Sequence, residues 1–126
     1  MKTIKYDETE EFQKDFKKLL KKYISLESDF ELAKRAAVEL YHIYKIDNSS
    51  VVLIPGFCCN QVKICKIRKF SCDALKQKGS KSGIRIIYAF WEKEEKVVFL
   101  EIYYKGCQQK EDYGRIKSYL KRQIKG

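Results

Sequence analysis

The sequence predicts an α+β protein in which a short strand and two helices precede a run of antiparallel strands and a final helix. Two observations carry this prediction. Apolar residues recur at helical spacing between residues 9 and 44. From residue 51 to residue 104, three or four β-type segments then follow one another between turn-forming residues. Runs of helices and runs of strands that are separate along the chain are typical of α+β architecture.

The first part of the chain is predicted to form a strand and a helical hairpin. Thr3–Tyr6 is the opening strand, and a helix begins near Thr9, because apolar residues then fall on one stripe with the lysines largely outside it. A second helix is predicted to open at Ser28–Glu31, which has capping-box spacing, and to continue to about Tyr44. The short connector Ile24–Glu27 indicates an antiparallel hairpin. The stripe of the first helix comprises Phe12, Phe16, Leu19, Leu20 and Tyr23.

The remainder of the chain is predicted to form strands and a last helix. Val51–Ile54 is a short apolar run, and Val62–Phe70 is a strand. Ile84–Trp91 and Lys96–Tyr103 form two strands whose four-residue charged connection fits a hairpin. The final helix spans about Lys110–Gln123. Because no repeat or interdomain linker interrupts the sequence, residues 1–126 are expected to form one domain. The apolar stripe of the last helix comprises Tyr113, Ile116, Leu120 and Ile124.

Positive charge is concentrated in the central strands. Lys and Arg outnumber Asp and Glu by 27 to 17, which gives a net charge of +10. Eight basic residues and one acidic residue lie between Gln61 and Phe90, so +7 of this charge falls within thirty residues. Such a localised positive field favours an anionic partner, namely RNA, DNA, an acidic protein or a membrane surface. Composition alone is equally compatible with a solvated basic surface.

Other sequence features restrict the class of protein. The N-terminus is charged from Lys2 and lacks the apolar segment of a signal peptide, and no apolar run approaches the length of a membrane span. A cytoplasmic protein with no membrane partner is therefore expected. The five cysteines include no C-x-x-C pair and His42 is the single histidine, so we expect reduced cysteines, no metal site and no small-molecule cofactor.

Three segments carry a resemblance to a known family. The first is Phe12–Leu19, a helix of the form Phe-x-Lys-Asp-Phe-Lys-Lys-Leu after a short strand. The second joins Lys66–Phe70 to Ser82–Ala89, which contains Ser-Gly-x-Arg-x-x-Tyr, and the third is Phe99–Gly106 before the terminal helix. In this order the chain resembles, over nearly its whole length, the RelE/ParE superfamily of bacterial toxin–antitoxin toxins, nearer the RelE branch. The resemblance implies a compact α+β domain with two helices packed against a twisted antiparallel sheet.

The resemblance also implies a function. Members of this superfamily are small basic toxins that a cognate antitoxin neutralises, and acidic residues on that partner would match the cationic face. RelE-like members enter the ribosomal A site and cut mRNA, so we expect a ribosome-dependent mRNA endonuclease that inhibits translation without a metal, by attack of the 2′-hydroxyl. ParE-like members instead poison DNA gyrase. Because fold does not settle function, the alternative is a ParE-like gyrase inhibitor or an inactive nucleic-acid-binding relative.

Candidate site residues follow from the chemistry and from the motif. Cleavage by the 2′-hydroxyl needs a base, an acid and cations that stabilise the phosphorane, and His42 falls within a helix. RelE-type enzymes without a histidine use Lys, Arg and Tyr. By motif, Lys66 and Arg68 match paired basic strand positions that bind the scissile phosphate, and Arg85 matches the Ser-Gly-x-Arg arginine that stabilises the transition state. Tyr113 is matched to a late tyrosine that assists the nucleophile or stacks on a base. The predicted RNA-binding residues are Lys63, Lys69, Lys76, Lys78, Lys81 and Lys105.

Each of these assignments has a structural alternative. Arg85 also occurs in superfamily members that do not cleave RNA, and there it can brace the sheet. Lys66 and Arg68 can be ordinary surface residues on one strand face. Tyr113 fits the apolar stripe of the last helix equally well. Glu101 lies on a strand near the cations, and an ion pair with one of them would weaken the catalytic interpretation.

Overall fold

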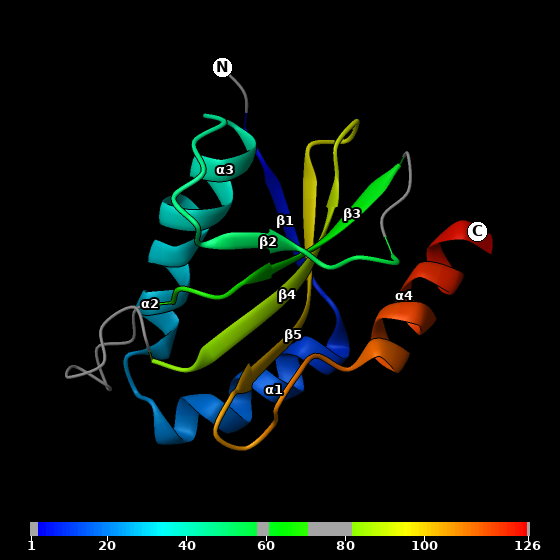
Figure 1. Cartoon of the computed structure of the whole chain (residues 1–126). Helices are drawn as coiled ribbons and strands as arrows, with labels where there is room; N and C mark the ends of the chain where they lie inside the picture. The colour runs from blue at the N-terminus through cyan, green and yellow to red at the C-terminus, as the bar shows by residue number, and fades with distance from the viewer. Residues whose placement is uncertain (1–2, 58–60, 71–81, 126) are drawn as a thin grey trace.

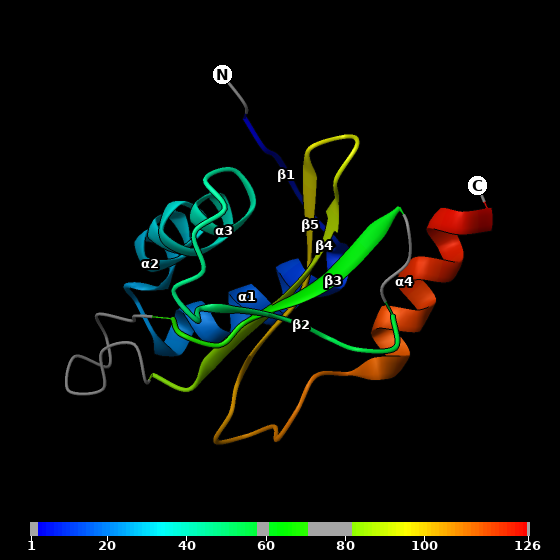
Figure 2. The same ribbon diagram turned by 45° about the horizontal axis from the view of Figure 1, so that its top comes forward.

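A computed structural model describes residues 3–57, 61–70 and 82–125 of the chain, with residues 124 and 125 as backbone. Within these residues the strands form one sheet in the order β1-β5-β4-β3-β2 (Figure 1). Helices α1, α2 and α3 lie on one side of this sheet and α4 lies on the other (Figure 2). The strands are β1 (Lys5–Glu8), β2 (Val51–Leu53), β3 (Val62–Ile67), β4 (Ile84–Trp91) and β5 (Lys96–Tyr104). The helices are α1 (Glu10–Lys22), α2 (Leu26–Ala33), the π-helical η1 (Lys34–Glu39), α3 (Leu40–His42) and α4 (Tyr113–Lys125).

The sheet is mixed. Strands β2 to β5 are antiparallel neighbours, as the sequence predicted, whereas β1 pairs in parallel with β5 at the edge. A β-bulge interrupts the β4–β5 pairing: Tyr88 lies opposite Phe99, but Ile87 lies opposite Glu101, so Leu100 is the extra residue. The bulge shifts the register by one residue and places Leu100 and Glu101 both on the α4 side of the sheet.

The side of the sheet that faces α1 and α2 is filled by aromatic residues. The rings of Phe12, Phe30 and Phe99 pack with centroids 4.8–5.5 Å apart. The predicted stripe on α1 is confirmed, because Phe12 and Tyr23 are buried and the other members pack against the core. Thr9 is the N-cap, and its Oγ1 accepts a hydrogen bond of 3.2 Å from the backbone N–H of Phe12.

The predicted capping box at Ser28 is wrong. Helix α2 begins at Leu26 after the N-cap Ser25, because the fully buried Leu26 packs into the core from the first helical position. The hydroxyl of Ser28 instead donates to the carbonyl of Ser25 at 3.0 Å. The helical region then widens into η1, where the hydroxyl of Tyr6 lies 3.3 Å from the Lys34 carbonyl. It ends at α3, before Tyr44, and Lys45 adopts a left-handed φ of 58° that is typical of a helix C-terminus.

Helix α4 covers part of the opposite side of the sheet. It begins at Tyr113, later than predicted, and buries Ile116 and Tyr119. Tyr113, which was placed on the apolar stripe, is 42 % exposed, and the buried Tyr119 takes part in its place, with its hydroxyl accepting from Nε1 of Trp91 at 2.9 Å. No helix in the described part of the chain is long and apolar enough to cross a membrane. Apolar residues under α4 include Ile54, Val62, Ile64, Ile87, Ala89, Val98 and Leu100.

Candidate functional site

Two of the cations that the motif singled out, Lys66 and Arg85, lie on the α4 side of the sheet, and Arg68 lies at the same end of the sheet. Along β3, Ile64 faces α4 and Cys65 faces the other helices, so Lys66 returns to the α4 side. Lys66 pairs with Ile87 on β4, and Arg85 lies two residues before Ile87 on the same side. Arg68 follows directly after β3. The pairing of β3 with β4 extends to Ile67 and Ile86, and the side chain of Arg68 reaches the Ser49 carbonyl next to β2.

The Ser-Gly-x-Arg motif builds the start of β4. The hydroxyl of Ser82 donates to the carbonyl of Phe70 at 2.5 Å and accepts from the backbone N–H of Ile84 at 3.2 Å. Gly83 has φ +87°, a conformation that side chains rarely adopt, and a Cβ there would lie 3.1 Å from the Tyr104 ring. The serine and glycine therefore set the path of the backbone into β4, and the arginine of the motif projects from a fixed strand.

Arg68 and the neighbouring Lys69 are tied to the turn before β2. Nε of Arg68 donates to the carbonyl of Ser49 at 3.0 Å, and Nζ of Lys69 lies 3.5 Å from the carbonyl of Asn48. The backbone N–H of Arg68 donates to the carbonyl of Ser50 at 2.9 Å. Both side chains are exposed, so their remaining donors face solvent. An anion can therefore reach them without a change of fold.

Lys66 has a carboxylate partner that the sequence did not reveal. Its Nζ lies 3.0 Å and 3.4 Å from the two carboxylate oxygens of Glu111, whose side chain is 6 % exposed. The suspected partner, Glu101, binds other groups: its oxygens accept from the Asp112 backbone N–H at 2.9 Å and from Gln108 Nε2 at 2.7 Å. Glu111 lies 45 residues from Lys66 in the short segment before α4, and no spacing rule links the two positions.

Tyr103 is a second group that sequence reasoning missed. It is buried and lies directly opposite Arg85 in the β4–β5 register. Burial raises the pKa of the Tyr103 hydroxyl to about 12, the carboxylates of Glu111 and Glu101 add to that rise, and Arg85 opposes it. The phenol therefore keeps its proton at neutral pH. Its position on β5 could have indicated that it faces the cations. The bulge shifts the β4–β5 register by one residue, however, so the sequence does not show which residue lies opposite Arg85.

Tyr113 lies at the start of α4, beside this cluster. Its ring packs against Phe57 with centroids 5.5 Å apart, and Nζ of Lys110 lies 5.1 Å from the ring centroid. Because 42 % of the residue is exposed, part of the ring is open to a ligand. Among the described residues, the aromatic contact of Tyr113 is with Phe57.

The predicted RNA-binding lysines do not all lie at this site. Lys63 points to the opposite side of the sheet from Lys66, and its Nζ lies 3.6 Å from the carboxylate of Glu92. Lys105 is exposed just after β5, where its backbone N–H donates to the Gly83 carbonyl at 2.7 Å. The remaining predicted contacts, Lys76, Lys78 and Lys81, lie outside the described residues. Of the cysteines, Cys65 is a buried thiol and Cys107 an exposed one, while Cys58, Cys59 and Cys72 also lie outside the described residues.

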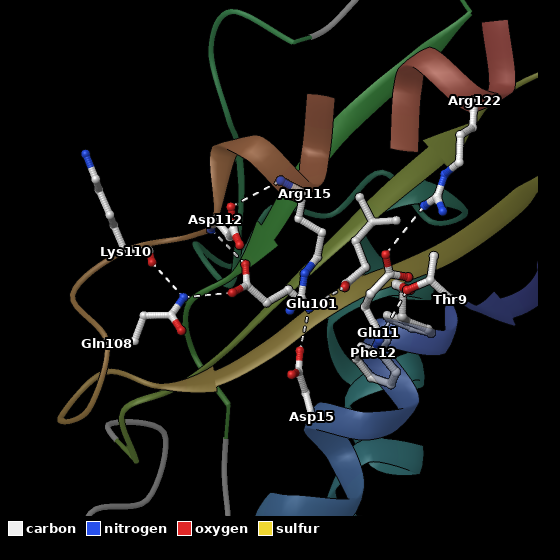
Figure 3. A network of polar contacts seen from close by, with 12 residues as sticks. Thr9, Glu11, Phe12, Asp15, Glu101, Gln108, Lys110, Asp112, Arg115 and Arg122 are labelled. Atoms are coloured by element: carbon white, nitrogen blue, oxygen red, sulfur yellow. Dashed lines mark hydrogen bonds and ion pairs between the residues drawn. The ribbon is translucent and has the colours of Figure 1, made fainter. Parts of the chain in front are cut away.

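A polar network fastens the segment that carries Glu111 (Figure 3). Glu101 on β5 accepts from both Gln108 and Asp112. Arg115 on α4 reaches across to α1, where its guanidinium binds the Asp15 carboxylate at 2.5 Å, and it also donates to the Leu100 carbonyl at 3.0 Å. Burial raises the pKa of Glu101, although these donors and the charge of Arg115 oppose the rise. The network joins α1, β5 and α4 and fixes the place of Glu111.

Comparison with known proteins supports the fold. No protein-family model matches the sequence, and no curated protein sequence matches it. Among solved structures, the chain is similar to the archaeal RelE–RelB complex from Pyrococcus horikoshii OT3, with a TM-score of 0.50 and 14% sequence identity. The match covers 83% of this chain and 98% of that chain. At this identity the likeness concerns the fold alone, and it confirms the predicted RelE-like α+β architecture.

Proposed function

We propose that this RelE-like fold is the toxin of a type II toxin–antitoxin pair and acts as a ribosome-dependent mRNA endonuclease that inhibits translation. The observation that carries the proposal is the grouping of Lys66 and Arg85 on one side of the sheet, next to Tyr103 and the exposed ring of Tyr113. Arg68 is exposed at the same end of the sheet. Cations on a rigid sheet are suited to stabilise the charge that develops on a phosphorane. The reaction needs no metal, because the 2′-hydroxyl of RNA is the nucleophile.

The proposed roles follow from the placement of each side chain. Arg85 stabilises the phosphorane, since it projects from a central strand and its NH1 binds only the nearby Ile84 carbonyl among the described residues, at 3.2 Å. Lys66 and Arg68 bind the scissile phosphate. The half-exposed ring of Tyr113 stacks on a base, a contact that is typical of single-stranded RNA recognition.

The flanking lysines have a less specific role. Lys69 and Lys105 are exposed at the same end of the sheet and are suited to contact the RNA backbone, which requires only charge. Lys76, Lys78 and Lys81 stay predicted contacts of the same kind. Lys63 lies on the other side of the sheet, so we do not include it in the catalytic face.

The proposed partners are a cognate antitoxin, the ribosome and mRNA, which places the protein in the cytoplasm. The similar archaeal structure is a RelE–RelB complex. The net charge of +10 favours an acidic antitoxin segment over the cationic face. The same charge favours association with ribosomal RNA, and such association weakens with salt.

One observation favours the alternative of a ParE-like inhibitor or an inactive relative. The ammonium group of Lys66 is already neutralised by Glu111, so the protein does not need an RNA phosphate to balance this charge. In that case the cationic cluster would brace the sheet and the segment before α4.

The test is to express the chain from a tightly controlled promoter and to map mRNA 5′ ends across the genome. We expect new ends inside translated frames, and we expect Arg85→Ala to reduce cutting by about 100- to 1000-fold, as for the loss of one preorganised donor. Lys63→Ala is the matched control, because it removes a cation from the opposite side of the same sheet. Growth arrest with intact mRNA would favour gyrase as the target, and neither arrest nor cuts would favour an inactive relative.

A further inference from the structure

We propose that Glu111 is a positioning residue that holds the ammonium group of Lys66 in place for the RNA phosphate. This inference rests on the proposed function. A lysine side chain is long and flexible and has many rotamers, so a lysine that must meet one phosphate oxygen gains from a fixed partner. The carboxylate of Glu111 holds Nζ of Lys66 with both oxygens, at 3.0 Å and 3.4 Å.

A positioning residue should be more buried than the residue that it holds, and Glu111 is more buried than Lys66. The Glu111 side chain is 6 % exposed, whereas that of Lys66 is 24 % exposed. The carboxylate of Glu111 therefore lies in the protein interior, and the ammonium group of Lys66 lies between it and solvent. An ammonium group has three donors. After binding one carboxylate, it retains donor capacity toward the open side, where Arg85 also lies.

The residues on either side of Glu111, Lys110 and Asp112, belong to the network of Figure 3. The residue after it, Asp112, donates its backbone N–H to Glu101, which also accepts from Gln108. Arg115 then ties the first turn of α4 to Asp15 on α1 and to the Leu100 carbonyl on β5. Contacts from Glu101 on β5 and Asp15 on α1 thus hold Asp112 and Arg115, which follow Glu111 in the chain, and Glu111 contacts Lys66.

This arrangement has a kinetic consequence that differs from that of an RNA-binding residue. Removing the negative charge of Glu111 makes the face more positive, so RNA binding is retained or strengthened. The ammonium group, however, loses its fixed position, and a misplacement of about 1 Å at a catalytic group costs on the order of 100-fold in rate. Glu111→Gln should therefore lower kcat and leave KM unchanged or lower.

The first experiment measures cleavage of ribosome-bound mRNA by wild type, Glu111→Gln, Lys66→Gln and the double variant. We expect Glu111→Gln to reduce kcat about 100-fold. We expect the double variant to equal Lys66→Gln, because Glu111 acts through Lys66 and the two effects are then not additive. The matched control is Glu92→Gln, which breaks the pair with Lys63 on the opposite side and should change kcat less than twofold.

Other results would contradict the proposal. A Glu111→Gln protein that cuts as fast as wild type or faster would show that the carboxylate is dispensable or blocks the site. Losses that multiply in the double variant would show that Glu111 acts independently of Lys66. If Glu111→Gln fails to fold, Lys66→Gln and the double variant still test the proposal. The proposal requires these two variants to have the same kcat.

A second measurement does not depend on activity. Nitrogen-15 NMR relaxation of the lysine Nζ groups reports how firmly each one is held. We expect Lys66 to be rigid in wild type and as mobile in Glu111→Gln as Lys63, whose side chain is 47 % exposed. If wild type cuts no mRNA but Lys66 behaves in this way, the proposed function fails and the positioning role stands. If wild type cuts mRNA and Lys66 is as mobile as Lys63, the positioning role fails and the function stands.

Discussion

The two sides of the sheet bury their residues in different ways. On the side of α1 and α2, aromatic rings from three elements meet at centroid distances of 4.8–5.5 Å around Phe99. On the side of α4, the apolar cluster that contains Ile87, Leu100 and Tyr103 is bordered by charged residues. Lys66 lies opposite Ile87, Arg85 lies opposite Tyr103, and Glu111 pairs with Lys66. Apolar packing stabilises the first side. The second side is stabilised in part by ion pairs and hydrogen bonds of charged residues.

This difference bears on where function can lie. Apolar packing is non-directional and stabilises the fold in proportion to buried area. A buried charge is costly unless it is paired, so each charge on the α4 side has to be supported by a specific contact. Glu111 forms an ion pair with Lys66, and Glu101 accepts hydrogen bonds from two N–H donors. By contrast, no carboxylate in the described residues pairs with Arg85. Arg85 is thus a partly exposed cation of this side whose charge no described carboxylate neutralises.

The largest effect is expected on the packed side. Phe99→Ala should lower the free energy of unfolding by about 3–5 kcal/mol, because it removes the ring that Phe12, Phe30 and Tyr88 contact. Urea denaturation measures the change. Tyr113→Ala is the control from the other side, since an exposed ring should cost less than about 1 kcal/mol. Equal losses for the two variants would remove the distinction between a packed side and a functional side.

The next prediction is that the free energy of unfolding decreases as pH falls. His42 stacks on Phe90 on the packed side, and its Nε2 lies 2.7 Å from the Tyr88 hydroxyl. Burial, with the charges of Lys45 and Lys63, lowers the pKa of His42 to about 4. Since the unfolded histidine titrates near pH 6.5, the unfolded state binds more protons between these values. Stability is therefore full above about pH 6.5 and falls toward pH 4, by on the order of 2–3 kcal/mol.

Urea denaturation at a series of pH values tests this slope, with His42→Gln as the variant that should remove it. On the other side of the sheet, the raised pKa of Glu101 gives the opposite sign, because a carboxylate that is costly to ionise stabilises the fold less as pH rises. The difference between wild type and His42→Gln isolates the histidine. A difference that is constant with pH would mean that His42 is not held neutral by its burial.

The polar network on the α4 side should contribute less than the aromatic core. Arg115→Ala should lower stability by about 1.5–3 kcal/mol, because it removes charge-assisted hydrogen bonds to Asp15 and to the Leu100 carbonyl. Arg122→Ala is the matched control. Arg122 lies 3.7 Å from Glu11 and both side chains are well exposed, so its loss should cost less than about 1 kcal/mol. Similar losses for the two arginines would show that the network adds no more than surface pairs do.

The sequence predicted the packed side better than the α4 side. The stripe on α1 and the start of this helix near Thr9 follow from periodicity, because they depend on neighbours within one helix. The charged side depends on the bulge after Phe99. Without it the hairpin register would place Ile102 opposite Arg85, and with it Tyr103 takes that place.

The cluster around Lys66 was predictable only in part. Alternation along β3 and the family motif place Lys66 and Arg85 on one side, because strand geometry has a fixed period. The approach of Glu111 depends on where the chain turns between β5 and α4, and this turn is set by Glu101 and Arg115. Such contacts join residues that are far apart in sequence, so composition and spacing do not reveal them.

The smallest effect compares the N-caps of the two helices that flank the sheet. Thr9 caps α1, and Oδ1 of Asp112 accepts from the backbone N–H of Arg115 at 3.1 Å in the first turn of α4. Thr9→Ala and Asp112→Ala should each cost about 1 kcal/mol in thermal or urea unfolding. Only Asp112→Ala should also slow mRNA cleavage, because the next residue toward the N-terminus is Glu111. A cleavage rate that falls equally in both variants would mean that the loss follows overall stability and not the position of Glu111.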